Sequence, residues 1–177
     1  MSREDKPMNI AGCLLVATGL LFAQAKDDPQ YEYWAGCKVG SWVKNRMEMD
    51  NQGQKIEYES VTRLLEVSEE KVIVETLMKM KTGDRTIDSP PRKQEIKAKT
   101  PQKGKTINEK DEEITVAGKS LKCRFYEIES EAAEKKPKMT VKAWMSKDIP
   151  GGVAKSEVTS ETMKGPIRTI ALEWENK

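Results

Sequence analysis

The last forty residues constrain the fold of this chain most, because apolar and polar side chains alternate there between two breaks. One stretch places four apolar side chains on one face of an extended chain: Met139, Val141, Ala143 and Met145. The alternation returns at Ile170, Leu172 and Trp174. Ile149-Pro150-Gly151-Gly152 suits a type II turn, and Lys164-Gly165-Pro166 forms the second break. This pattern predicts a three-stranded antiparallel meander with one packed and one largely solvated face.

The same alternation runs through the preceding sequence. It predicts strands over 38–50, 55–68, 71–81, 113–116 and 119–130, with a bulge near Arg63 in the second of them. Residues 26–36 are polar and aromatic, which suits an irregular lead-in or a short helix packed on one end of the sheet. We therefore predict a mainly β protein: a single curved antiparallel sheet, a half-barrel-like meander of seven or eight strands, with little helix.

Residues 82–112 break the alternation and are predicted to form a basic, proline-containing loop. Pro90, Pro91 and Pro101 oppose regular strand pairing, and 94–98 is the one stretch that suits an edge strand. Six cations make the loop a candidate contact for an anionic partner: Arg92, Lys93, Lys97, Lys99, Lys103 and Lys105. The alternative is a solvated loop without a partner.

The N-terminus has the pattern of a secretory signal peptide. Arg3 and Lys6 precede an apolar run over 10–22, and Ala23-Gln24-Ala25 supplies a small-x-small cleavage site. We predict a signal peptide at 1–25 and a single domain at 26–177, periplasmic or extracellular, with no stable transmembrane anchor after processing. An uncleaved anchor is the alternative. Cleavage leaves the formal net charge at +2, so we expect no nucleic-acid partner.

The complete absence of histidine restricts the chemistry of the chain. No catalytic triad or metal site can use imidazole, and we expect no catalytic residues, no metal site and no cofactor. Carboxylates are abundant, so a hydrolase that uses two carboxylates is kept as an alternative. They occur at Asp111, Glu112, Glu113, Glu127, Glu129 and Glu131.

Methionine recurs on the alternating positions of the predicted strands. Six form a candidate ligand face: Met47, Met49, Met78, Met80, Met139 and Met145. Methionine adapts its shape to acyl chains, although it also fills cores that lack aromatic residues. Signal cleavage would leave two cysteines, Cys37 and Cys123, which are a candidate disulfide or two buried reduced thiols.

The segment Trp144-Met-Ser-Lys-Asp-Ile-Pro-Gly-Gly-Val153 joins two predicted strands through a proline turn. Together with the signal peptide and the meander, it resembles exported bacterial proteins of unknown function that carry a W-x-S-x-x-I-P-G-G segment. More broadly, it resembles the lipoprotein-carrier (LolA-like) half-barrel superfamily. The resemblance implies an antiparallel sheet curled over an apolar cavity and a role in carrying or sensing a hydrophobic or lipid-modified ligand in the bacterial envelope. Such carriers have a helical lid, and no strong lid helix is visible in this sequence.

These observations lead to three hypotheses for the function. The first is an exported, non-enzymatic module that binds a hydrophobic ligand, a lipid-modified protein or an envelope partner. The second is a structural or interaction domain with a filled core, and the third is the carboxylate hydrolase. An empty apolar cavity of roughly several hundred Å³ would favour the first over the second.

Overall fold

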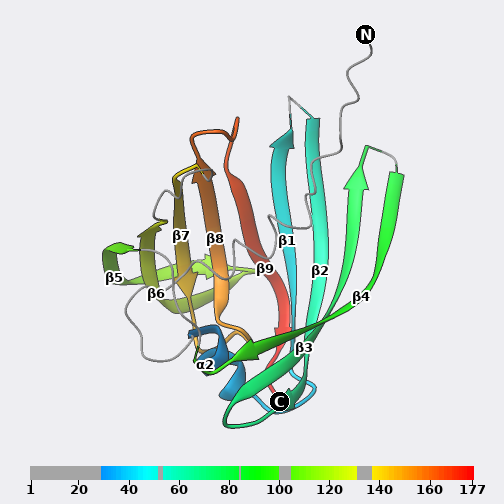
Figure 1. Ribbon diagram of the computed structural model, residues 1–177, viewed down its shortest axis with the longest axis vertical. Coiled ribbons are helices and arrows are strands. Elements are labelled where there is room, and N and C mark those ends of the chain that lie inside the picture. The colour runs from blue at the N-terminus through cyan, green and yellow to red at the C-terminus, as the bar shows by residue number, and fades with distance from the viewer. Residues whose placement is uncertain (1–28, 52–53, 84, 100–104, 131–136) are drawn as a thin grey trace.

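The computed structural model describes residues 29–51, 54–83, 85–99, 105–130 and 137–177, and they form one nine-stranded sheet and a short helix (Figure 1). The elements are α2 (Pro29–Ala35), β1 (Trp42–Asn51), β2 (Gln54–Val67), β3 (Lys71–Thr82), β4 (Arg85–Lys97), β5 (Lys105–Val116), β6 (Lys119–Glu129), β7 (Met139–Met145), β8 (Val153–Ser160) and β9 (Ile167–Glu175). The predicted single antiparallel sheet is confirmed, with nine strands rather than seven or eight.

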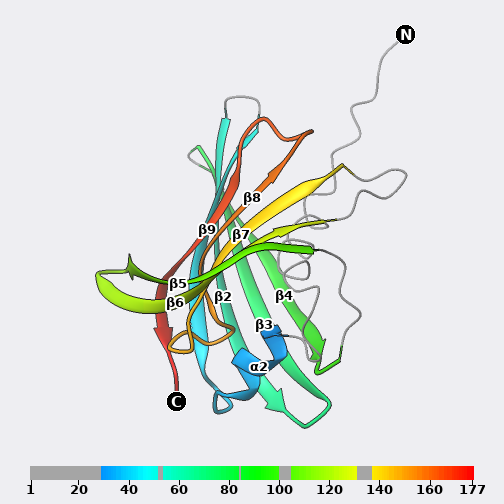
Figure 2. The ribbon, with the colours of Figure 1, turned by 90° about the vertical axis from the view of Figure 1, so that its left-hand side faces the viewer.

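The strand order is β4-β3-β2-β1-β9-β8-β7-β6-β5, and every pairing is antiparallel. The first and last strands, β1 and β9, pair at the centre of the sheet, whereas β4 and β5, consecutive in sequence, form its two edges. The sheet curves without closing, and α2 lies beside the ends of β3 and β4 (Figure 2). One face of the sheet is therefore concave.

The loop predicted over 82–112 is wrong, because most of this segment is strand. β4 contains Pro90 and Pro91 and pairs along β3, and β5 pairs along β6. Thr76 pairs with Arg92 and Met78 with Ser89, so both prolines stand opposite Leu77 in a bulge. A bulge leaves its extra residue outside the ladder, and an edge strand has a side that needs no N–H donors. Both features accommodate the prolines, and sequence pattern alone did not reveal them.

The irregular face pattern of β2 has the predicted cause. Leu64 pairs with Val74 and Glu66 with Ile73, so Leu65 is an extra residue in β2. The bulge therefore lies two residues beyond Arg63. Asn51-Gln52-Gly53 predicts a three-residue hairpin loop between the first two strands, and residues 52–53 of this loop are outside the described residues.

The closing meander is confirmed as β7, β8 and β9, together with the turn that joins the first two. Gly151 has φ +77°, as the third position of a type II turn requires, and the Gly152 N–H donates to the Ile149 carbonyl over 2.8 Å. The face predicted for β9 is only partly right. The register with β1 shifts between Lys44 and Asn45, so Trp174 pairs with inward-facing Val43, but Ile170 pairs with outward-facing Arg46.

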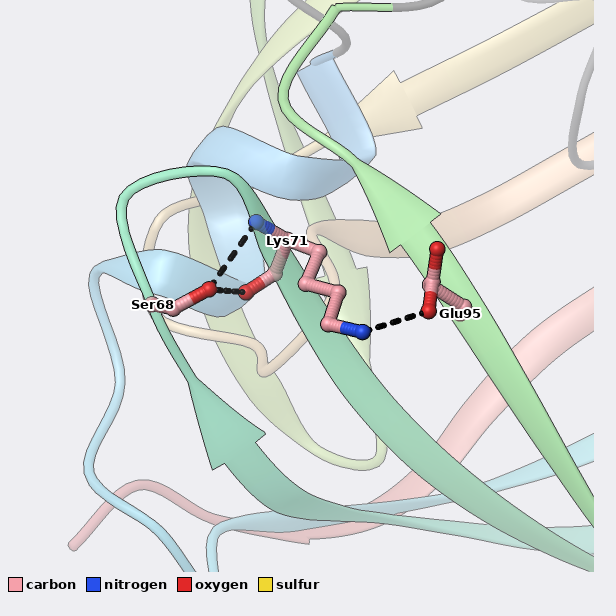
Figure 3. Close-up of polar contacts among 3 residues, drawn as sticks. All are labelled: Ser68, Lys71 and Glu95. Atoms are coloured by element: carbon pink, nitrogen blue, oxygen red, sulfur yellow. Dashed lines mark hydrogen bonds and ion pairs between the residues drawn. The ribbon is translucent and has the colours of Figure 1, made fainter.

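Helix α2 is held at one end of the sheet by its aromatic residues, as the sequence suggested. Trp34 is buried, and the Tyr31 hydroxyl donates to the Ser68 carbonyl over 2.7 Å in the turn between β2 and β3. Figure 3 shows this turn closed by two hydrogen bonds between the Ser68 hydroxyl and the Lys71 backbone. The Lys71 ammonium also pairs with Glu95 of β4 over 2.7 Å, which lowers the pKa of that carboxyl.

Candidate functional site

A cavity of about 410 Å³ lies on the concave face of the sheet. We call it the concave cavity. Its walls come from β1, β2, β3, β4, β8 and β9, from α2, and from the turn at Pro150 and Gly151. Its volume is in the range of small-molecule sites.

The apolar part of the lining is divided between two ends of the cavity. Toward α2 the lining residues are Trp34, Val43, Val74 and Ile96. Further along the strands they are Met47, Tyr58 and Met78. Burial raises the pKa of Tyr58, so its hydroxyl stays neutral near neutral pH. Both ends can accept apolar parts of a ligand.

Between these ends, polar side chains cross the sheet from strand to strand. We call them the polar band: Arg92, Thr76, Thr62, Ser60, Asn45, Thr169 and Ser156. Thr76 pairs with both Arg92 and Thr62, and Ser60 pairs with Asn45, so the band continues across four strands. It extends into β9 and β8 through the pair of Thr169 and Ser156.

Two observations describe the hydrogen bonding in the polar band. The hydroxyl oxygens of Thr62 and Thr76 share a hydrogen bond of 3.0 Å. The side-chain oxygen of Asn45 is buried and accepts no hydrogen bond from any described residue. A buried polar atom without a partner is costly, so this oxygen is suited to a donor from water or a ligand. The sequence did not reveal the band, because its residues become neighbours only through the register of the paired strands.

The six methionines predicted as a ligand face cluster around one end of the cavity. Met47 and Met78 line it directly. The remaining four, Met49, Met80, Met139 and Met145, belong to the same apolar cluster or pack against it. Met145 is only 1% exposed, so it fills the core. The candidate face therefore divides into two lining residues and a supporting layer.

The cations predicted as an anionic-partner loop do not act as one group. Arg92 and Lys93 line the cavity on β4, and Lys97 ends the same strand. Lys105 begins β5 at the opposite edge of the sheet, and Lys99 follows β4. Lys103 lies outside the described residues. Of the six predicted cations, Arg92 and Lys93 are therefore the two that the structure places at the cavity.

The carboxylates kept for a hydrolase are engaged elsewhere. Asp111 pairs with Arg124 over 2.9 Å, and Glu112 accepts a hydrogen bond from the Trp144 indole over 3.0 Å. Glu113 accepts a hydrogen bond from Ser120, Glu127 pairs with Lys142, and Glu129 pairs with Lys138. Glu131 is outside the described residues. No aspartate or glutamate occurs among the described residues that line the cavity.

Cys37 and Cys123 are both buried, as predicted, and belong to one apolar cluster. They are free thiols in the structure, and the disulfide between them stays a prediction to be tested. The Cys37 thiol donates to the Tyr33 carbonyl over 3.3 Å. Burial raises the pKa of both thiols, and that of Cys123 reaches about 11.

We expect both cysteines of the mature protein to react slowly with iodoacetamide at pH 8 in the folded state, because burial and a raised pKa leave little thiolate. After denaturation without reductant, both thiols are expected to take up the label. Mass spectrometry counts the adducts. A protein that gains two adducts only after reduction contains the disulfide instead.

The comparisons with known proteins give distant structural likeness alone. No family model and no curated protein matches the sequence. A crystal structure of a protein from Bacteroides fragilis NCTC 9343, thought to be exported and with a YmcC-like fold, aligns with a TM-score of 0.49 and 7% identity. The alignment covers 79% of this chain and 97% of that one. This degree of similarity says nothing about a ligand, and the resemblance to lipoprotein carriers stays a prediction. Within the described ranges, none of the helices has the length and apolar character needed to cross a bilayer.

Proposed function

We propose that this protein is exported and binds a hydrophobic ligand in the concave cavity without catalysing a reaction. The cavity itself is the observation that carries the proposal, since a domain built only around a filled core would pack its concave face. Its apolar ends provide burial for an acyl chain or a similar group, worth about 25 cal/mol per Å² of apolar surface removed from water. A lipid-modified protein or another envelope partner would bind by placing an acyl chain or a similar apolar group in the cavity.

A non-catalytic role is supported by the chemistry of the lining. Hydrolysis by paired carboxylates needs two acids on either side of the scissile bond, and the described lining offers none. Its side chains supply shape, apolar surface and hydrogen bonds, which are the properties of a binding site.

A titration with Nile red tests the proposal, because this dye becomes fluorescent in apolar surroundings. The mature wild-type protein is expected to bind the dye, and Ser60→Phe to lose most of that binding because the ring fills the cavity from β2. Ser120→Phe is the matched control, since Ser120 is exposed on β6.

Thermal unfolding of both variants shows that they remain folded during the titration. Equal dye binding by wild type and a folded Ser60→Phe variant would contradict binding in this cavity. Thr169→Phe fills the cavity from β9 and provides a second variant if Ser60→Phe fails to fold.

Export is proposed from the N-terminal sequence, where Ala23-Gln24-Ala25 closes an apolar run. When the full chain is expressed with its own N-terminus in a bacterium, the exported protein is expected to begin at Lys26. Edman sequencing of the periplasmic and extracellular fractions checks this. An intact Met1 in the membrane fraction would show an uncleaved anchor.

A further inference from the structure

We infer that the ligand of the concave cavity is a single-chain amphiphile with an anionic head group, which Arg92 and the adjacent polar band hold while the chain lies against Met47 and Met78. This inference rests on the proposed function, because it concerns the ligand of the same site.

The position of Arg92 is the first support. Arg92 pairs in register with Thr76, whose side chain lines the cavity, so Arg92 belongs to the concave face of β4. Neighbouring strands lie about 4.8 Å apart, so the hydroxyls of Thr76 and Thr62 follow Arg92 directly across the sheet. An anion bound at Arg92 thus has hydroxyl donors beside it.

The charge of the lining is the second support. Arg92 forms no ion pair with any carboxylate of the described residues, although nearby cations do, as Lys71 pairs with Glu95 and Lys79 with Asp88. Lys93 also lines the cavity and forms no ion pair within the described parts of the chain. However, Lys93 is in register with Glu75 and Glu75 with Arg63, a row that faces away from the cavity, so the Lys93 ammonium belongs to the outward face. On the concave face, the described lining therefore presents one cation, Arg92, and no anion, so it favours a negative ligand.

The order of polar and apolar surfaces is the third support. The polar band lies between two apolar ends, and the buried oxygen of Asn45 has no donor among the described residues. A wholly apolar ligand would leave the buried Asn45 oxygen without a hydrogen bond, which costs binding free energy. An amphiphile places its head group and the water that accompanies it at the band and its chain beside the methionines.

Competition against bound Nile red distinguishes the head groups. The competitors are dodecanoate, dodecanol and dodecylamine, which share one chain length and are used below their micelle concentrations. Mature wild-type protein is expected to bind dodecanoate about tenfold more tightly than dodecanol, as a hydrogen bond to a charged group provides. Dodecylamine is expected to bind most weakly, and the preference for the carboxylate to decrease with added salt.

Arg92→Gln is expected to bring the ratio of dodecanoate to dodecanol affinity to about one, a change of preference that a loss of stability does not produce. Arg85→Gln is the control, because Arg85 lies on the same strand and does not line the cavity; it should keep the wild-type ratio. A preference that survives Arg92→Gln, or equal binding of dodecanoate and dodecanol by wild type, overturns the inference and leaves the proposed function standing. Failure of all three competitors and of the dye overturns both.

Discussion

Gly152→Ala is expected to lower the free energy of unfolding by about 2–4 kcal/mol, from backbone strain and overpacking together. Gly152 has φ +80°, a conformation that alanine adopts only with strain. An added Cβ would also lie 2.4 Å from Cγ of Tyr33, so the ring of α2 would have to move. Urea unfolding of the mature protein, followed by far-ultraviolet circular dichroism, measures the change.

Gly118→Ala separates the two contributions to this cost. Gly118 has φ +76° in the two-residue turn between β5 and β6, and an added Cβ would meet nothing within 4 Å. This variant is therefore expected to lose only the strain, about 1 kcal/mol. Equal losses in the two variants would show that Tyr33 does not pack on Gly152, and α2 would lose one of its supports.

Leu64→Ala is expected to cost about 2–5 kcal/mol, the range for removing a fully buried leucine. Leu64 is 0% exposed, and it belongs to the cluster that joins Trp34 of α2 to the sheet. Its backbone is also fixed, because its carbonyl accepts from Gly40 and its N–H donates to Ser41. The surrounding residues therefore cannot easily move in to fill the cavity that the truncated side chain leaves.

Leu77→Ala is the matched control for Leu64→Ala. Leu77 lies on β3 opposite the proline bulge and is 47% exposed, so its truncation is expected to change stability by less than about 1 kcal/mol. Urea midpoints of the two variants, compared with wild type, check the difference. A Leu64→Ala midpoint as high as that of Leu77→Ala would place the core elsewhere.

The sequence predicted the sheet because alternation is a local signal. The inward positions of β7 and the turn at Pro150 could be read directly, and both are as expected. β4 could not be read, because its two prolines are tolerated only through an edge position and a bulge, and both depend on which strand lies beside it. Ile170 on β9 was predicted on the wrong face for the same reason, because its orientation depends on the register between β9 and β1.

The candidate site was predicted in part for a similar reason. Met47 and Met78 were found because methionine stands out on alternating strand positions. The polar band was not found, since Asn45, Ser60, Thr62 and Thr76 are unremarkable within each strand. They form a band only when the pairing of β1, β2 and β3 places them side by side.

Binding of a hydrophobic ligand inside the concave cavity is tested most directly by the NMR signals of the methionine methyl groups. The mature protein carries methyl-labelled methionine and is titrated with dodecanoate below its micelle concentration. The methyls of Met47 and Met78 are expected to shift saturably, because both side chains line the cavity, whereas that of Met139, which packs against the same apolar cluster without lining the cavity, should change little. Unchanged signals of Met47 and Met78 at saturating dodecanoate, with shifts only at methionines away from the cavity, would contradict ligand binding at this site.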